Sequence, residues 1–284
     1  MNRIYTHNKN NYNTLVNIMI TLLIPFFIFS FYKNGFILYK SNIINKVMLF
    51  KPLYFILLSL VVNQLYRLIV KDNVNRSYNL LCNLLISIMV MPQTNIIVYI
   101  ILLVIFNLIH ILLKINIASL FILILSLCMY LTQNYTFNNL IEAMAIYRYS
   151  FIDYLIGKSS GGIGASFILW SIISYAILFI FKEYKKQIPL LGFALYYILL
   201  IALTFTKSNF DINYFVNANI IFTFIFLAPI SLYSPYTRGG CYIYGVLLGI
   251  FTFLFSLIDV NIAPFIAISI LSLISPLIDK LLTK

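Results

Sequence analysis

The chain has 284 residues, of which 62% are hydrophobic and only 9% are charged, and its formal net charge is +12. An ordinary soluble domain carries roughly a quarter charged residues, so this composition excludes a water-soluble fold and predicts an integral membrane protein. The positive charge does not indicate nucleic-acid binding, because the basic residues stand between apolar segments and form no basic arm.

The apolar runs predict helices that cross the membrane. They lack the alternation of barrel strands, and only helices and closed barrels satisfy every backbone polar group in lipid. Seven runs have about the length that crosses hydrocarbon: residues 15–33, 52–70, 94–113, 163–181, 188–206, 242–258 and 262–278. Three shorter runs are 78–91, 117–131 and 216–228. We therefore predict an all-α polytopic membrane protein with about ten transmembrane segments.

The order of these segments predicts two inverted five-helix repeats. The short, broken third and eighth segments end at Pro92 and Pro229. The first and sixth segments start at 15 and 163, and the fourth and ninth start at 94 and 242, an offset of 148 in both cases. A repeat with an odd number of crossings is inverted, and paired interrupted segments are typical of a site near the bilayer midplane. The predicted parts are a cytoplasmic tail 1–14, a first repeat 15–131, an extracytoplasmic loop 132–162, a second repeat 163–279, and a tail 280–284.

The distribution of Lys and Arg predicts the orientation. If all ten segments cross, twelve of the 19 basic residues lie on the side of the termini and seven, including Lys33, lie on the opposite side. The positive-inside rule then places both termini in the cytoplasm.

Few residues in the spans are candidates for acid–base or metal chemistry. The acidic residues fall at segment ends or in loops and are expected to be solvated or snorkelling: Asp72, Glu142, Asp153, Glu183, Asp211, Asp259 and Asp279. Cys82, Cys128 and Cys241 are expected to be small core residues, and two histidines far apart predict no metal site. Catalytic residues stay unknown.

The stretch GKSSGGIGASF, residues 157–167, is the strongest local motif. Gly161, Gly162 and Gly164 precede a long apolar run. They form either a tight turn into the next helix or a set of free backbone N–H groups that hold a phosphate.

Several segments together resemble one family. These are the opening run with a late proline, SYNLLCNLLISIMVMPQ, the glycine stretch with its following helix and basic loop, and LAPISLYSPYTRGGCYIYG before a closing P-L-I-D at 276–279. They are similar to the homologous large membrane subunits of the Rnf ion-translocating electron transport complex and of the sodium-pumping NADH:quinone reductase, the RnfD/NqrB family. The chain looks like a divergent member.

The resemblance implies a urea-transporter-like fold of two inverted five-helix repeats, and FMN held by a threonine through a phosphoester bond. Thr136 is the counterpart of that threonine, but Asn134, Tyr135 and Phe137 replace the usual small residues and proline around it. FMN is therefore expected to be covalent at Thr136, noncovalent, or absent.

Other positions keep part of the family pattern. Asn116 matches the asparagine of a flavin-site motif, whereas Ala165 and Ile230 replace acids. With Gly161, Gly162 and Gly164, Asn116 completes the candidate cofactor site. The resemblance implies an ion or solute path along the broken segments, for which the candidates are Pro92, Pro229, Ser231, Ser234, Pro235 and Thr237.

Three functions follow from these observations. The first is a membrane subunit of a redox-driven translocase, passing electrons through flavin coupled to Na⁺ or H⁺ movement, with the other membrane and peripheral subunits of an Rnf/Nqr-like complex as partners. The second is a channel or facilitator for a small solute on the same fold, which the shortage of buried charge favours. The third is a scaffold subunit without flavin.

Overall fold

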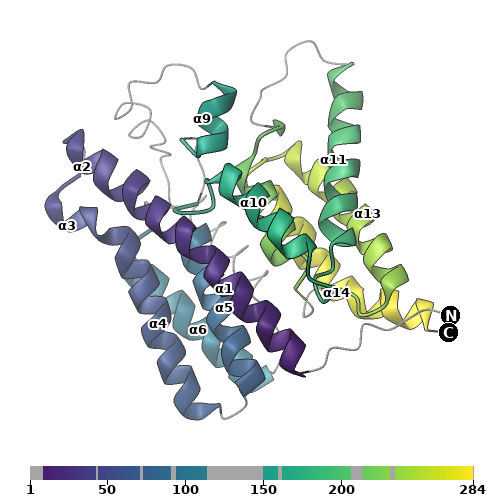
Figure 1. Ribbon diagram of the computed structural model, residues 1–284, viewed down its shortest axis with the longest axis horizontal. Coiled ribbons are helices and arrows are strands. Elements are labelled where there is room, and N and C mark those ends of the chain that lie inside the picture. The colour runs from purple at the N-terminus through teal and green to yellow at the C-terminus, as the bar shows by residue number, and fades with distance from the viewer. Residues whose placement is uncertain are drawn as a thin grey trace. The chain divides into compact units, whose positions relative to one another are not determined.

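The computed structural model describes residues 9–42, 44–70, 73–90, 94–113, 150–158, 162–205, 214–230 and 234–283. Every regular element within these ranges is helical, so the all-α prediction is confirmed for them (Figure 1). The chain divides into two compact units. One comprises Val16–Trp170, and the other comprises Ser171–Lys284 together with Met1–Leu15.

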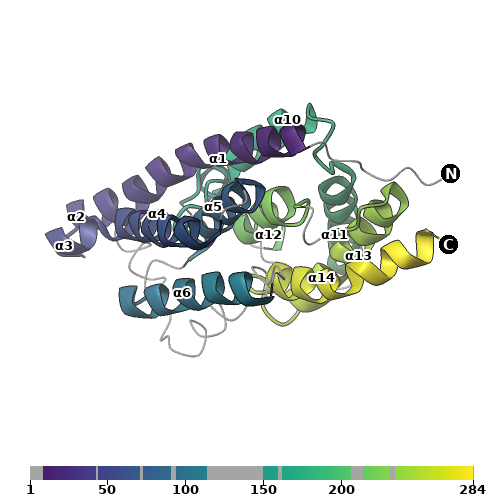
Figure 2. The same ribbon diagram turned by 90° about the horizontal axis from the view of Figure 1, so that it is seen from below.

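The unit Val16–Trp170 is built around three helices that follow one another in the chain. Helix α4 packs against both α5 and α6, and the three run side by side in both views (Figures 1 and 2). Its elements are α1 (Lys9–Phe31), a π-helical continuation η1 (Tyr32–Ile37), α2 (Leu38–Lys40), α3 (Lys46–Leu49), α4 (Lys51–Ile69), α5 (Asn73–Met89), α6 (Ile96–Leu113) and α9 (Phe151–Ile156).

The second unit contains α10 (Ile168–Phe179), which begins just before the boundary, α11 (Gln187–Thr204), α12 (Ala218–Phe222), a π-helical continuation η3 (Thr223–Leu227), α13 (Arg238–Ser256) and α14 (Ala263–Leu282). Helix α13 packs between α11 and α14. The contact with α11 depends on small residues, because a Cβ on Gly249 would lie 2.7 Å from the carbonyl oxygen of Gly192. Small residues are typical of such close contacts between membrane helices.

Five helical segments are long and apolar enough to cross a membrane: Asn13–Lys40, Lys51–Ile69, Gln187–Thr204, Arg238–Ser256 and Ala263–Leu282. They coincide with the predicted segments 15–33, 52–70, 188–206, 242–258 and 262–278, and Ile96–Ile109, Ile168–Phe179 and Ala218–Leu227 are shorter apolar helices. The multi-pass membrane architecture is thus supported, while the count of ten and the inverted repeat remain predictions. The segment 117–131 lies outside the described residues.

Three predicted boundaries were wrong. The segment 163–181 is a helix of only 12 residues, because residues before Ile168 form a turn. The first segment does not end at Lys33 but continues as a helix to Lys40. The ninth segment, predicted to start at 242, already begins at Arg238 as α13, because Thr237 caps that helix through its side chain.

Candidate functional site

The turn Gly162–Ser166 closes the C-terminal end of α5. Ile163 N–H donates to the carbonyl of Val90 at 2.7 Å, and Gly164 N–H donates to the carbonyl of Ile88 at 2.9 Å. Ala165 N–H shares the carbonyl of Ile88 at 3.4 Å. The last carbonyls of a helix have no partner within it, and lipid supplies none. The glycine turn therefore satisfies the end of the short third segment.

Gly162 and Gly164 allow this close approach. A Cβ on Gly162 would lie 2.7 Å from the carbonyl oxygen of Met89, and one on Gly164 would lie 3.0 Å from that of Phe26. The structure thus gives both glycines a packing role, consistent with a tight turn. Their role as cofactor ligands stays a prediction, and Gly161 lies outside the described residues.

Lys33 and Asn34 in η1 hold the same turn from the other side. Lys33 is 2% exposed, and its Nζ donates to Ser166 Oγ at 2.9 Å. Asn34 Nδ2 donates to the carbonyl of Ile163 at 2.7 Å. Lys33 was predicted to end the first segment as a charge on the side opposite the termini, but it lies within the helix, because the π-helical turn continues the first helix through it. An ammonium group buried in a membrane segment is a functional candidate that the charge count missed.

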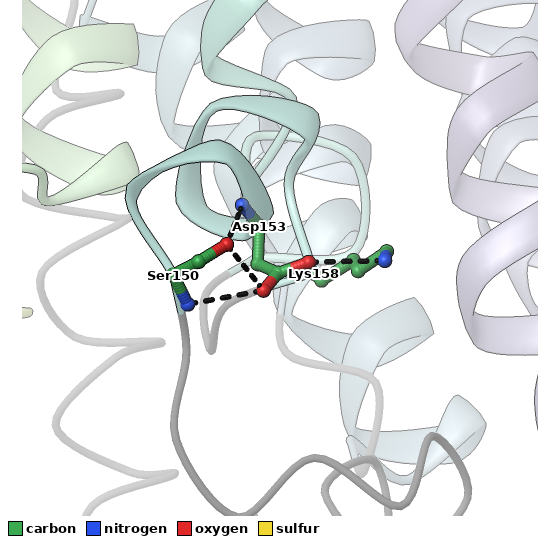
Figure 3. A network of polar contacts seen from close by, with 3 residues as sticks. All are labelled: Ser150, Asp153 and Lys158. Carbon is green, nitrogen blue, oxygen red and sulfur yellow. Dashed lines mark hydrogen bonds and ion pairs between the residues drawn. The ribbon is translucent and has the colours of Figure 1, made fainter.

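Helix α9 precedes this turn and is fixed by a capping box (Figure 3). Asp153 N–H donates to Ser150 Oγ at 3.3 Å, and Ser150 N–H donates to Asp153 Oδ2 at 3.0 Å. The bonds from Ser150 lower the pKa of Asp153 to about 2, with a further contribution from Lys158, whose Nζ lies 3.0 Å from Oδ1. At the other end, Gly157 adopts a φ of 90°, which favours glycine. A Cβ there would lie 2.6 Å from the carbonyl oxygen of Ser166, so α9 ends directly against the glycine turn.

In the second unit, the short eighth segment ends in a π-helical turn. All residues from Ala218 to Ile230 are buried. Ala228 N–H donates to the carbonyl of Thr223 five residues earlier, at 2.9 Å. The carbonyl of Ile225 accepts a bond of 2.8 Å from the hydroxyl of Tyr184, in the connection between α10 and α11. The helix stops at Pro229, which has no N–H to continue it.

Lys185 supports the backbone that follows this break. It is 1% exposed, and its Nζ donates to Ser234 Oγ at 2.8 Å and to the carbonyl of Ser234 at 3.2 Å. The ammonium also lies 5.2 Å from the centre of the Tyr236 ring. Burial lowers the pKa of Lys185 to about 8, an effect that the charge of Asp279 partly opposes. The sequence did not indicate this burial, because it depends on Ser234, 49 residues further along the chain.

Asp279 holds the next two residues. Its Oδ2 accepts from Tyr236 N–H at 2.8 Å, and its Oδ1 accepts from Thr237 N–H at 3.0 Å and from Thr237 Oγ1 at 2.8 Å. Asp279 was predicted to be a solvated or snorkelling charge. Instead its carboxylate binds the backbone of Tyr236 and Thr237, just before α13. The stretch Ser234–Gly240 has no acid of its own, and α14 supplies one.

The predicted path residues thus fall into two groups. Ser234, Pro235 and Thr237 lie together between Lys185 and Asp279, where the carbonyl of Pro235 also accepts from Cys241 Sγ at 3.3 Å. Pro229 precedes them, two residues after η3 ends at Leu227. The other candidates lie outside the described residues, namely Pro92, Asn116, Thr136 and Ser231.

Two of the three cysteines lie in the part of the chain that the structure describes. Cys82 and Cys241 are buried, which confirms their prediction as core residues, and Cys128 lies outside the described ranges. Among the residues that the structure describes, no group of three His, Cys, Asp or Glu side chains could hold a metal ion.

Comparison with known proteins identifies the family. The NQR2, RnfD, RnfE family matches residues 2–284. No curated protein matches the chain. The match covers nearly the whole sequence, and the helices of the structure are those of a multi-pass membrane protein. The chain therefore belongs to the NQR2, RnfD, RnfE family.

Proposed function

We propose that this protein is a membrane subunit of an Rnf/Nqr-type complex in which electron transfer through flavin is coupled to movement of Na⁺ or H⁺. The observation that carries the proposal is the family match over residues 2–284. The partners are the other membrane and peripheral subunits of such a complex. The protein lies in the bacterial inner membrane with both termini in the cytoplasm, and burial of Lys33 supports this orientation because it removes one of the seven opposing charges.

The proposal includes the inverted five-helix repeat. Trp170 Nε1 donates to the carbonyl of Leu22 at 2.9 Å, and these two residues are 148 positions apart. That separation equals the offset between the two predicted repeats. Equivalent positions of two repeats meet where a pseudo-two-fold axis passes, so this contact supports the first and sixth segments as counterparts.

The amides of the glycine turn have partners within the protein, which bears on how FMN could be held. The amides of Ile163, Gly164 and Ala165 already donate to α5, so these three N–H groups do not fit a phosphate cradle. Attachment of FMN at Thr136, and contacts from Asn116 and Gly161, therefore rest on the family resemblance alone.

The experiment that tests the proposal is purification of the tagged full chain from membranes of its own host. We expect redox subunits to co-purify, and in-gel flavin fluorescence to be lost in Thr136→Ala and kept in Thr132→Ala. Fluorescence that both variants keep would show that the flavin is not attached at Thr136. A chain that purifies alone and without flavin would contradict the redox function.

A second function, a channel or facilitator for a small solute, is favoured by the buried polar groups of the first unit. Asn63, Asn79, Asn83 and Asn107 are neutral and at most 4% exposed. Solute flux into liposomes that contain the purified chain alone, without any electron donor, would support this alternative. Dependence of flux on the partner subunits and an electron donor would support the translocase.

A further inference from the structure

Six buried, neutral polar side chains lie where α4, α5 and α6 pack together. They belong to Ser59, Asn63, Asn79, Asn83, Tyr99 and Asn107, and each is at most 4% exposed. The Tyr99 hydroxyl bonds Ser59 Oγ and the carbonyl of Phe55, and Ser59 Oγ donates to the carbonyl of Asn83 at 3.1 Å. Buried polar groups in a membrane segment are costly and are therefore functional candidates.

Four of these six residues are asparagines, and their side chains form one carboxamide cluster. Asn83 and Asn107 pair in both directions, at 3.3 and 3.1 Å. Asn79 Nδ2 donates to Asn107 Oδ1 at 2.7 Å and to Asn63 Oδ1 at 3.3 Å. Asn63 comes from α4, Asn79 and Asn83 from α5, and Asn107 from α6. One amide nitrogen thus lies between two oxygens from the two neighbouring helices.

The remaining oxygen of Asn79 has no donor. Asn79 Oδ1 is buried, and no residue in the described part of the chain donates to it. Asn79 itself is 1% exposed, so bulk water does not reach its side chain freely. A carbonyl oxygen left unpaired in a membrane interior costs free energy unless a donor or a cation occupies its lone pairs.

We propose that this carboxamide cluster binds a monovalent metal cation, with Asn79 as the central ligand. The terminal torsion of asparagine is broad, so rotation of the Asn79 amide is accessible. That rotation exchanges its nitrogen for its oxygen and brings three Oδ1 atoms together, from Asn63, Asn79 and Asn107. Oxygens are the ligands that hard cations prefer, and a cation among them replaces the two N–H···O bonds.

The chemistry of the cluster selects a metal ion rather than a proton. Carboxamides do not titrate in the physiological range, so they carry no exchangeable charge for a proton relay. The four side chains of the cluster are neutral carboxamides. A neutral set of ligands suits a single positive charge better than a divalent ion. This inference deepens the proposed function, because it assigns Na⁺ rather than H⁺ to this site and names its ligands.

The test measures ²³Na line broadening and the melting temperature of the purified full chain. NaCl replaces choline chloride up to 300 mM at constant ionic strength. A ligand that binds only the folded state stabilises it, so we expect Na⁺ to raise the melting temperature by about 2–8 °C. Asn79→Leu should lose both the shift and the broadening. Equal stability in both salts, with no broadening for the wild-type chain, would overturn the proposal.

Asn79→Asp provides a test that does not depend on the folding of Asn79→Leu. Without Na⁺ this variant should be less stable than the wild type, because it buries an unpaired charge, and Na⁺ but not choline should restore it. Asn261→Asp is the matched control, because Asn261 belongs to an asparagine cluster in the other unit, where its Oδ1 accepts from Asn217 Nδ2 at 3.1 Å. It should respond to Na⁺ as the wild type does.

A result in which Asn79→Asp gains nothing from Na⁺ would show that the cluster only joins the helices or holds a water. Cation binding is measured on the chain alone, whereas the proposed function is tested by its partners and flavin. Failure of one test therefore leaves the other intact.

Discussion

Asp279 near the end of α14 holds Thr237 at the start of α13, because its Oδ1 accepts both the backbone N–H of Thr237 at 3.0 Å and its hydroxyl at 2.8 Å. The same hydroxyl accepts from Gly240 N–H at 3.1 Å and so caps α13. One carboxylate therefore fixes both the end of the break and the first turn of the following helix.

Substitution of Asp279 should loosen this end of the break. Asp279→Asn keeps the shape but removes the charge that strengthens three hydrogen bonds, and we expect a loss of about 1–3 kcal/mol in the free energy of unfolding. Cys241, whose Sγ donates to the carbonyl of Pro235, should become more reactive toward maleimide. The measurement uses a Cys82→Ser, Cys128→Ser background, with Asp259→Asn as control. Unchanged labelling and stability would show that the carboxylate does not fix the break.

Lys185 should make stability depend on pH in the alkaline range. Its folded-state pKa of about 8 lies below the ordinary 10.5, so the unfolded state binds more protons between these values and stability rises with pH. We expect a gain of about 2 kcal/mol from pH 7.5 to 9.5 in detergent. Lys185→Met should remove this slope, whereas Lys186→Met, the neighbouring lysine, should keep it. A slope retained in Lys185→Met would assign the effect to another group.

Gly162→Ala should destabilise the glycine turn. The added Cβ would lie 2.7 Å from the carbonyl oxygen and 2.9 Å from the Cα of Met89, so backbone must move. Overpacking of this kind costs about 1–3 kcal/mol. Gly164→Ala is the graded comparison, because its nearest contact is 3.0 Å, and it should lower the melting temperature less. Equal effects of the two substitutions would contradict the assigned contact with Met89.

Ser150→Ala should open helix α9, because a helix of six residues depends on its N-cap. An N-cap side chain contributes about 1 kcal/mol, which corresponds to about 5-fold faster exchange of the amides that open with the helix. Hydrogen–deuterium exchange of residues 151–157 measures this effect, and Ser150→Thr should retain protection. Exchange that Ser150→Ala leaves unchanged would show that the glycine turn alone holds α9.

The two helix ends at Pro229 and at Thr237 show which features could be predicted from the sequence. Pro229 ends a buried helix as expected, since the missing N–H is a property of proline itself. The roles of Lys185 and Asp279 could not be predicted, because they come from segments 49 and 42 residues away from the groups they bind. In the sequence both residues look like ordinary charges at the ends of apolar runs.

The glycine stretch shows the same limit in the first unit. The glycines at 162 and 164 indicated a turn, but the carbonyls of α5 that occupy its amides lie more than 70 residues earlier. Lys33 was predicted to end the first segment because charge usually ends a span. Instead, a π-helical turn carries Lys33 within the helix. Its buried ammonium group donates to the hydroxyl of Ser166, which lies 133 residues away in the sequence.

The sequence by itself determined the membrane class, the helical fold, the approximate position of five long apolar helices and the family. These follow from local composition, because hydropathy and backbone satisfaction in lipid depend on neighbours along the chain. Only the tertiary structure decided which polar groups are buried and what they contact, including Lys33, Lys185, Asp279 and the orphan oxygen of Asn79. Those partners lie far apart in sequence, so packing of distant helices, and not the local pattern, brings them together.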